Sequence, residues 1–296
     1  MEHKQIKKRI QRMTSGQPVY PALLKEIRDY PKELYYIGDP KLLEEKCVSI
    51  VGSRKTNQYG RSTAYSFGKA LGQRGITVVS GMAVGIDTCA HEGALQEKGN
   101  TAAVLACGLD LCYPPRNREL KGKIESAGIV LSEYPPGTAA QRYYFPQRNR
   151  IISGLSPLTV VVQAGNRSGA LITAELAADQ GRDVGAVPGN IDSEYNLGSN
   201  KLLREGAFAL TGVQDLLEAS GVSVLSEPEA ERMLSDEEKQ LYFLLCSHGE
   251  MSLDQLAFYL KKPVNEVGSL AIVMEMRGSF FLLWEKFLLQ KLENRL

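Results

Sequence analysis

The chain has 296 residues, 43% of them hydrophobic and 23% charged, with 28 glycines. This length suggests one large domain, or a large and a small one, and the composition excludes disordered, collagen-like and coiled-coil proteins. A balance of 35 basic against 34 acidic side chains leaves a net charge of +1, so the overall charge indicates no partner.

Several classes of protein are excluded by what the sequence lacks. The longest stretch without a charge, 151–166, contains Gly and Pro and is shorter than the ~20 apolar residues of a membrane-spanning helix. The basic N-terminus is followed by no apolar segment, which argues against a secretory signal. Five cysteines without CxxC spacing and three histidines form no disulfide framework or zinc pattern. We therefore expect a cytoplasmic protein with no membrane partner, no cofactor and no metal.

The first two thirds of the chain predict an α/β fold. Residues 1–46, rich in Pro and Tyr after residue 14, are predicted to form an irregular lead-in packed on the core. From 47 to 220, short β-branched runs alternate with helical segments. The runs are apolar throughout, as in parallel strands buried on both faces, and cover 47–51, 76–80, 101–106, 128–132, 158–163, 183–187 and 208–212. They predict a doubly wound, mostly parallel sheet whose ligands bind at the carboxyl ends of the strands.

The C-terminal part predicts a second, small domain. A helix is expected over 213–220, and the polar stretch 221–234 with Pro228 is predicted to be a linker. Within 235–296, Ser235 and Glu238 have the spacing of a capping box, and helices are expected over 236–248, 252–261 and 263–278. The segment 279–289 is compatible with a hairpin. This order resembles a winged helix, and a small helical protein-interaction domain fits it equally well.

Two long stretches of the α/β part contain no acidic residue. Residues 47–86 hold five basic side chains and 134–174 hold four: Arg54, Lys55, Arg61, Lys69 and Arg74, then Arg142, Arg148, Arg150 and Arg167. Both stretches include strand-to-helix loops, which converge on one crevice in a doubly wound fold. The sequence therefore predicts an electropositive mouth for an anionic ligand.

Three of these loops have features of phosphate-binding turns. Gly52 and Ser53 follow a strand and precede Arg54, whose planar guanidinium matches phosphate oxygens. Gly81 and Gly85 open a second helix. Arg167 and Ser168 open a third, with Ser168 as an expected N-cap. The alternative for each loop, a tight turn that needs glycine, leaves the missing carboxylates unexplained.

The next segment favours a nucleic acid strand as the anion. Neither a Walker A motif nor GxGxxG is present, which argues against P-loop and dinucleotide chemistry. Residues 142–150 interleave arginine with aromatic side chains, a combination that binds phosphates while stacking exposed bases: Arg142, Tyr143, Tyr144, Phe145, Arg148 and Arg150. The alternative is a loop whose aromatic side chains are buried in the core.

The sequence also contains residues of the kind that form a catalytic acid/base group. Asp87 and His91 share a helix face, and Glu92 and Glu133 complete a set of titratable groups. We interpret His91 as a packing residue, because no GxSxG nucleophile motif accompanies it. We therefore expect no enzymatic activity.

Several strings together resemble the DNA-processing protein A (DprA, or Smf) family of bacteria over about residues 18–220. They are VGSR, SGMAVGIDTCAH, SEYPPGT, FPQRNRIISGLS, SGALITAELAADQGRDVGAVPGN and GSNKLLREGA. The resemblance implies an extended Rossmann-like domain, a homodimer, and single-stranded DNA binding without sequence preference. It also implies that incoming DNA is protected and that the recombinase RecA is loaded on it in natural transformation (competence) and recombination.

The resemblance also implies a set of binding residues. It maps the family's strand pocket onto Gly52, Ser53, Arg54, Ser80, Gly81, Phe145, Arg148, Asn149, Arg150, Arg167, Ser168 and Gly169, with Asn200 and Lys201 at the rim. Ala139 and Ala140 stand where many relatives are lysine-rich, so one backbone contact is expected to be either missing or replaced by Arg142, and the affinity to be modest.

Two other functions remain open at this point. A lysine-decarboxylase-like nucleotide phosphoribohydrolase has a similar sheet, but its PGGxGT motif is missing, and the corresponding position reads QAGNRSGAL. In the second alternative, the small C-terminal domain makes the protein mainly an adaptor, and DNA binding is secondary.

Overall fold

The computed structural model describes residues 9–96, 100–222, 235–248 and 251–276. It divides into two compact units, Met1–Ser223 and Val224–Leu296, which are described separately. The helices among these residues include none long and apolar enough to span a membrane.

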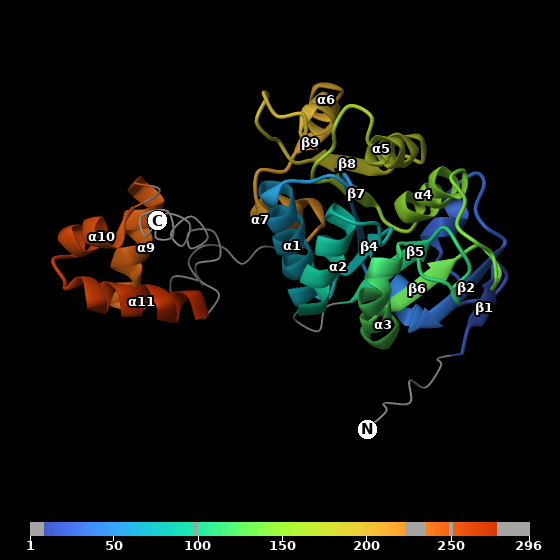
Figure 1. The fold of residues 1–296 in the computed structure, drawn as a ribbon, viewed down its shortest axis with the longest axis horizontal. Helices are drawn as coiled ribbons and strands as arrows, with labels where there is room; N and C mark the ends of the chain where they lie inside the picture. Colours follow the sequence, from blue (N-terminus) through green and yellow to red (C-terminus); the bar gives the residue numbers. More distant parts are fainter. Residues whose placement is uncertain (1–8, 97–99, 223–234, 249–250, 277–296) are drawn as a thin grey trace. The chain divides into compact units, whose positions relative to one another are not determined.

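The first unit is built on a 9-stranded sheet in the order β1-β2-β6-β5-β4-β3-β7-β8-β9 (Figure 1). The strands β3 (Cys47–Val51), β4 (Thr77–Ser80), β5 (Thr101–Leu105), β6 (Ile129–Ser132), β7 (Leu158–Val161), β8 (Asp183–Ala186) and β9 (Phe208–Ala209) are parallel to their neighbours in this set. All residues of β3 to β7 are buried, as their continuous apolar runs require. The predicted α/β class and doubly wound sheet are confirmed.

The N-terminal segment differs from the prediction. Instead of an irregular lead-in, it contributes two strands: β1 (Gln11–Thr14) pairs with β2 (Glu33–Gly38), and β2 with β6, both antiparallel. The prolines at 18, 21 and 31 hid this regularity, because they lie between the strands rather than within them. The lead-in is thus one edge of the sheet.

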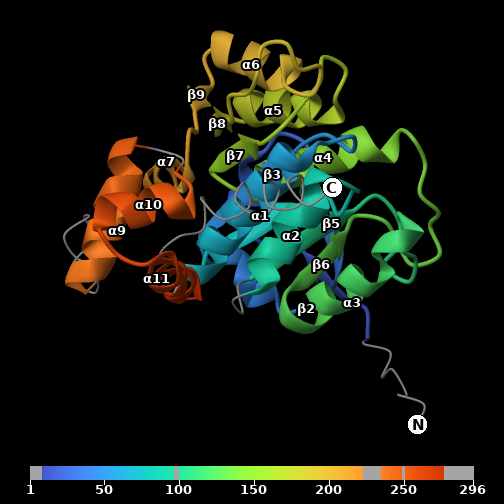
Figure 2. The ribbon, with the colours of Figure 1, turned by 60° about the vertical axis from the view of Figure 1, so that its left-hand side comes forward.

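Helices cover both faces of the sheet. The helices α1 (Gln58–Gln73), α2 (Ile86–Gln96) and α3 (Arg118–Ala127) lie side by side on one face (Figures 1 and 2). On the other lie α4 (Tyr144–Gly154) and α5 (Gly169–Asp179). Alternate residues of β5 show the two layers, since Ala102 and Val104 belong to the core beneath α4 and α5, whereas Ala103 and Leu105 pack with α3. Helix α6 (Leu197–Arg204) contacts α5 and β8, and α7 (Val213–Ala219) contacts α1.

The strand order places a topological switch point between β3 and β7. From β3 the chain crosses through α1 to β4 on one side, while β7 pairs with the other side of β3. The helices that follow β3 and β7 therefore diverge to opposite faces and leave a crevice at the carboxyl ends of these strands. Ligands of open α/β sheets bind in such a crevice.

The second unit contains α9 (Asp236–His248), α10 (Leu253–Leu260) and α11 (Val264–Met276). They enclose a small core of Leu241, Leu245, Met251, Leu256, Ala257, Val267 and Met274. The predicted capping box is confirmed: Ser235 N–H donates to Glu238 Oε2 (2.7 Å), and Glu238 N–H donates to Ser235 Oγ (3.3 Å). The expected hairpin over 279–289 lies outside the described residues.

Candidate nucleic-acid interface

A pocket of about 910 Å³ lies at the switch point. Five segments line it: the β3–α1 loop (residues 52–57), the segment 83–87 after β4, helix α4, the end of the β7–α5 loop with the first turn of α5, and the β8–α6 loop (residues 187–196). The convergence of acid-free loops predicted from the sequence is therefore seen for the loops after β3, β4 and β7.

The β3–α1 loop brings two cations to this pocket. Ser53 N–H donates to the carbonyl of Gln163 (2.7 Å), which ties the loop to the end of β7. A Cβ on Gly52 would lie 2.5 Å from the Ile86 side chain, so this position requires glycine. Arg54 and Lys55 are exposed, and neither has an ion-pair partner among the described residues.

The start of α5 supplies a third cation. Ser168 Oγ accepts a hydrogen bond from Ala170 N–H (3.3 Å), which confirms the predicted N-cap. Arg167 beside it is exposed, and the structure gives it no carboxylate partner within the part of the chain it describes. Gly169 is also exposed and lines the pocket. The positive end of the α5 dipole adds to the attraction for an anion.

One aromatic ring of α4 belongs to the pocket. The Arg54 guanidinium lies over Phe145, 5.0 Å from the ring centroid, and Tyr113 packs on the same ring at 5.4 Å. Asn149, one turn on, lines the pocket and donates weakly to Gly169 O (3.5 Å). The neighbouring Tyr143 and Tyr144 pack edge to face and do not line the pocket. Tyr143 is exposed and Tyr144 is half-buried, so the alternative of aromatic side chains buried in the core is not what the structure shows.

Arg148 departs from the prediction of an exposed phosphate contact. Only 4% of this residue is exposed. Nη1 donates to Gly81 O at 2.7 Å and also to Val104 O. Arg148 thereby joins α4 to the ends of β4 and β5 from beneath the pocket. A Cβ on Gly81 would lie 2.5 Å from the guanidinium, so Gly81 makes room for it. Burial lowers the pKa of Arg148 to about 10, which leaves the group charged at neutral pH.

Ser80 is also internal. It is fully buried, and its hydroxyl donates to Ile50 O (2.6 Å). The expectation that Ser80 contacts the strand is therefore corrected, because the hydroxyl joins β4 to β3.

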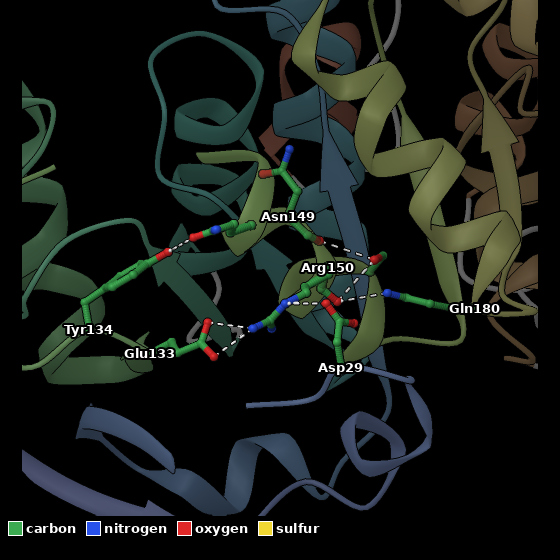
Figure 3. A network of polar contacts seen from close by, with 8 residues as sticks. Asp29, Glu133, Tyr134, Asn149, Arg150 and Gln180 are labelled. Carbon is green, nitrogen blue, oxygen red and sulfur yellow. Dashed lines mark hydrogen bonds and ion pairs between the residues drawn. The ribbon is translucent and has the colours of Figure 1, made fainter. Parts of the chain in front are cut away.

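Arg150 is neutralised rather than available. Nη2 donates to both carboxylate oxygens of Glu133 at 2.7 Å, and Nε lies 3.1 Å from Asp29 Oδ2 (Figure 3). Its side chain is 13% exposed, and it does not line the pocket. The predicted phosphate contact is corrected, because this guanidinium already binds two carboxylates. The charge pattern did not reveal them, since both acids lie outside the acid-free stretch 134–174.

The predicted rim residues lie apart from this pocket. Lys201 pairs with Glu205 (3.5 Å), and the Asn200 amide both accepts from Gly189 N–H (3.1 Å) and donates to Gly189 O (3.0 Å). Arg142 is exposed just before α4 but does not line the pocket. Asn200 therefore supports the β8–α6 loop.

The titratable pair Asp87 and His91 is buried in the way expected of packing residues. His91 Nδ1 lies 2.6 Å from Thr101 Oγ1, and burial lowers the pKa of His91 to about 3. Asp87 Oδ2 accepts from Ala83 N–H (3.2 Å), and burial raises the pKa of this carboxyl while the charge of Arg148 opposes the rise. The described residues contain no cluster of three or more His, Cys, Asp or Glu able to hold a metal.

Residues 11–221 match the family of DNA recombination-mediator protein A. The chain belongs to this family. It is 44% identical to DNA processing protein DprA of Streptococcus pneumoniae over 198 residues, which cover 67% of this chain and 70% of that one. It is 40% identical to Protein Smf of Synechocystis over 247 residues, 82% of this chain and 62% of that one.

Two solved structures of the family share the fold. The X-ray structure of DNA processing protein A from Streptococcus pneumoniae has a TM-score of 0.69 at 41% identity, covering 71% of this chain and 74% of that one. The Helicobacter pylori protein, described with a single-stranded DNA binding mode, has a TM-score of 0.64 at 31% identity, covering 70% and 94%. The extended Rossmann-like character implied by the resemblance is confirmed.

Sequence reasoning missed one wall of the pocket. Asp192, Ser193, Glu194 and Tyr195 of the β8–α6 loop line it, so the mouth is not uniformly positive as predicted. The rule that loops after parallel strands converge would have found them, had it been applied to the strand ending at Ala186. In this member of the family the pocket is therefore lined by basic residues and by acidic residues of the β8–α6 loop.

Proposed function

We propose that the chain binds single-stranded DNA without sequence preference in the pocket between the ends of β3 and β7. The observation that carries the proposal is a pocket lined by three exposed cations without an ion-pair partner among the described residues, Arg54, Lys55 and Arg167, and by the ring of Phe145, over which Arg54 lies. Cations bind successive phosphates, and an aromatic face stacks any base, so binding of this kind is insensitive to sequence. The single-stranded DNA binding mode of the Helicobacter pylori relative supports the assignment.

The acidic residues of the β8–α6 loop favour a single strand bound in one orientation. Asp192 and Glu194 repel phosphates, so the backbone lies along the basic wall and the bases face Phe145 and Tyr195. Duplex DNA binds worse, because its bases are stacked and paired and cannot reach an aromatic face.

The wider role follows from the family. We propose that the protein acts in the cytoplasm, protects incoming single strands and loads RecA on them in natural transformation and recombination. A homodimer would double the track and add avidity to a weak single site. Because the chain spans 62% and 70% of two relatives' lengths, these partners are proposals for the whole protein.

We also propose that this function is binding without catalysis. Asp87 borders the pocket but is only 6% exposed and accepts a hydrogen bond from Ala83 N–H, and His91 is fully buried against Thr101. No observation on the described residues or from the comparisons favours the nucleotide-hydrolase alternative.

The test is fluorescence anisotropy of a labelled oligo-dT of about thirty nucleotides, titrated at several salt concentrations beside a duplex of equal length. We expect tighter binding to the single strand, with log affinity falling by about 0.7 per phosphate contact as log salt rises. Equal affinity for duplex, or no binding at low salt, would contradict the proposal. An assay for base release from AMP would then address the hydrolase.

A further inference from the structure

Gln163 lies directly behind the pocket, at the end of β7, and is fully buried. Its Oε1 accepts from Thr56 Oγ1 (2.7 Å) and from Asn57 N–H (3.3 Å). Its Nε2 donates to Asn57 Oδ1 (3.0 Å) and to Asn196 Oδ1 (2.9 Å). Both donors and both acceptor positions of this amide are therefore used inside the protein.

Backbone groups determine which way the amide faces. Asn57 N–H can only donate, so the Gln163 atom beside it is the oxygen. Asn57 Oδ1 caps α1 by accepting from Gly60 N–H (3.1 Å), so the Gln163 atom that reaches it is the nitrogen. A carboxylate at position 163 would face two acceptor oxygens, a costly arrangement in a buried site.

The four hydrogen bonds connect two walls of the pocket. Thr56 and Asn57 end the β3–α1 loop, which carries Arg54 and Lys55, and Asn196 ends the β8–α6 loop, which carries Asp192 and Glu194. Asn196 N–H also donates to Ser193 O (3.0 Å), so the connection extends into the residues that line the pocket.

The amides are closely packed. A Cβ on Gly60, in the first turn of α1, would lie 2.5 Å from Gln163 Oε1, and a Cβ on Gly189 would lie 2.3 Å from the Asn196 side chain. The two glycines let the backbone approach the amides closely. Gln163 is therefore a closely packed contact between the two loops, beside the Tyr59 hydroxyl, which donates to Pro188 O (2.8 Å).

We propose that Gln163 is a positioning residue for strand binding: it holds the basic and the acidic loop at the separation that admits one strand. It does not line the pocket, so it acts through the two loops that do. The inference rests on the proposed function and assigns a cause to the geometry of the same site.

The test measures oligo-dT affinity and its salt dependence for the full chain and for Gln163→Glu. We expect at least tenfold weaker binding and a salt slope smaller by about 0.7, the value of one lost phosphate contact. The control is Thr101→Val, at the amino end of β5, which removes a buried hydroxyl that donates to Val78 O and contacts His91 Nδ1, away from the pocket. Its salt slope should equal that of the wild type.

A second pair of variants adds no charge and remains informative if Gln163→Glu does not fold. Thr56→Val removes the hydroxyl that donates to Gln163, whereas Thr56→Ser keeps it. We expect several-fold weaker binding with a reduced slope for the first and near wild-type values for the second. Unchanged slopes in the Gln163 and Thr56→Val variants would overturn the inference. A wild-type chain that binds no single strand would instead overturn the proposed function.

Discussion

The guanidinium of Arg54 lies over the ring of Phe145, 5.0 Å from its centroid. Arg54 comes from the loop after β3 and Phe145 from the first turn of α4, and the two meet only because both reach the switch point of the sheet. The contact places a cation for phosphate beside a flat surface for a base. One nucleotide can engage both groups, so this pair is the centre of the proposed site.

Replacing Arg54 should remove binding without unfolding the protein. Arg54→Glu places a negative charge where a phosphate is expected, and we predict at least a tenfold loss of oligo-dT affinity and a salt slope smaller by about 0.7. The measurement is anisotropy together with a thermal melt. Arg74→Glu, the same charge change at the exposed end of α1, should retain affinity. Equal losses in the two variants would point to overall charge rather than to the site.

Arg150 should matter for stability and little for binding. Arg150→Gln leaves the partly buried Glu133 without its bidentate partner, and we expect the free energy of unfolding to fall by about 1–3 kcal/mol. Oligo-dT affinity should stay within about twofold, because this charge is already neutralised. Chemical denaturation and anisotropy check the two values. A salt slope smaller for Arg150→Gln than for the wild type would instead support the phosphate contact predicted for Arg150 from the sequence.

Neutralising the acidic wall should strengthen binding. Glu194→Gln removes repulsion of phosphates within the pocket, so we expect affinity to rise a few-fold at low salt. The gain should fade as the Debye length shrinks to about 8–10 Å near physiological salt. Glu44→Gln, at an exposed site before β3, is the matched control. Weaker binding by Glu194→Gln would show that this carboxylate contacts the strand directly.

His91 should make the fold sensitive to acid. Burial lowers its pKa from 6.5 to about 3, so between these values the unfolded chain binds a proton that the folded chain does not. Stability from this group is present above pH 6.5 and is lost on acidification toward pH 3, by about 1.4 kcal/mol per pH unit. The raised pKa of Asp87 acts in the opposite direction.

Comparing the wild type with His91→Gln by denaturation at pH 7 and pH 5 isolates the histidine, since Asp87 is present in both. The variant should lose less stability between the two pH values. Equal losses would mean that His91 is protonated in the folded state.

Much of the site could be predicted from local sequence. The predictions that were wrong share one cause. Gly52, Arg54, Phe145 and the Ser168 cap lie where the strand-to-helix pattern predicts them. Arg148 and Arg150 carry the same charge and belong to the same motif, yet both are satisfied internally. Their partners come from distant strands and loops, so no local pattern reveals them.

The sequence by itself determined which segments form the parallel strands β3 to β9, because continuous apolar runs must be buried on both faces of a parallel sheet, but not the antiparallel strands β1 and β2. It also determined where the binding edge lies, since the loops after parallel strands meet at one edge. Only the tertiary structure decided which charges remain free, because that depends on which distant residues pack together. The same reason places Gln163 behind two loops that are far apart along the chain, and brings the acids of the β8–α6 loop into the pocket that Arg54 lines.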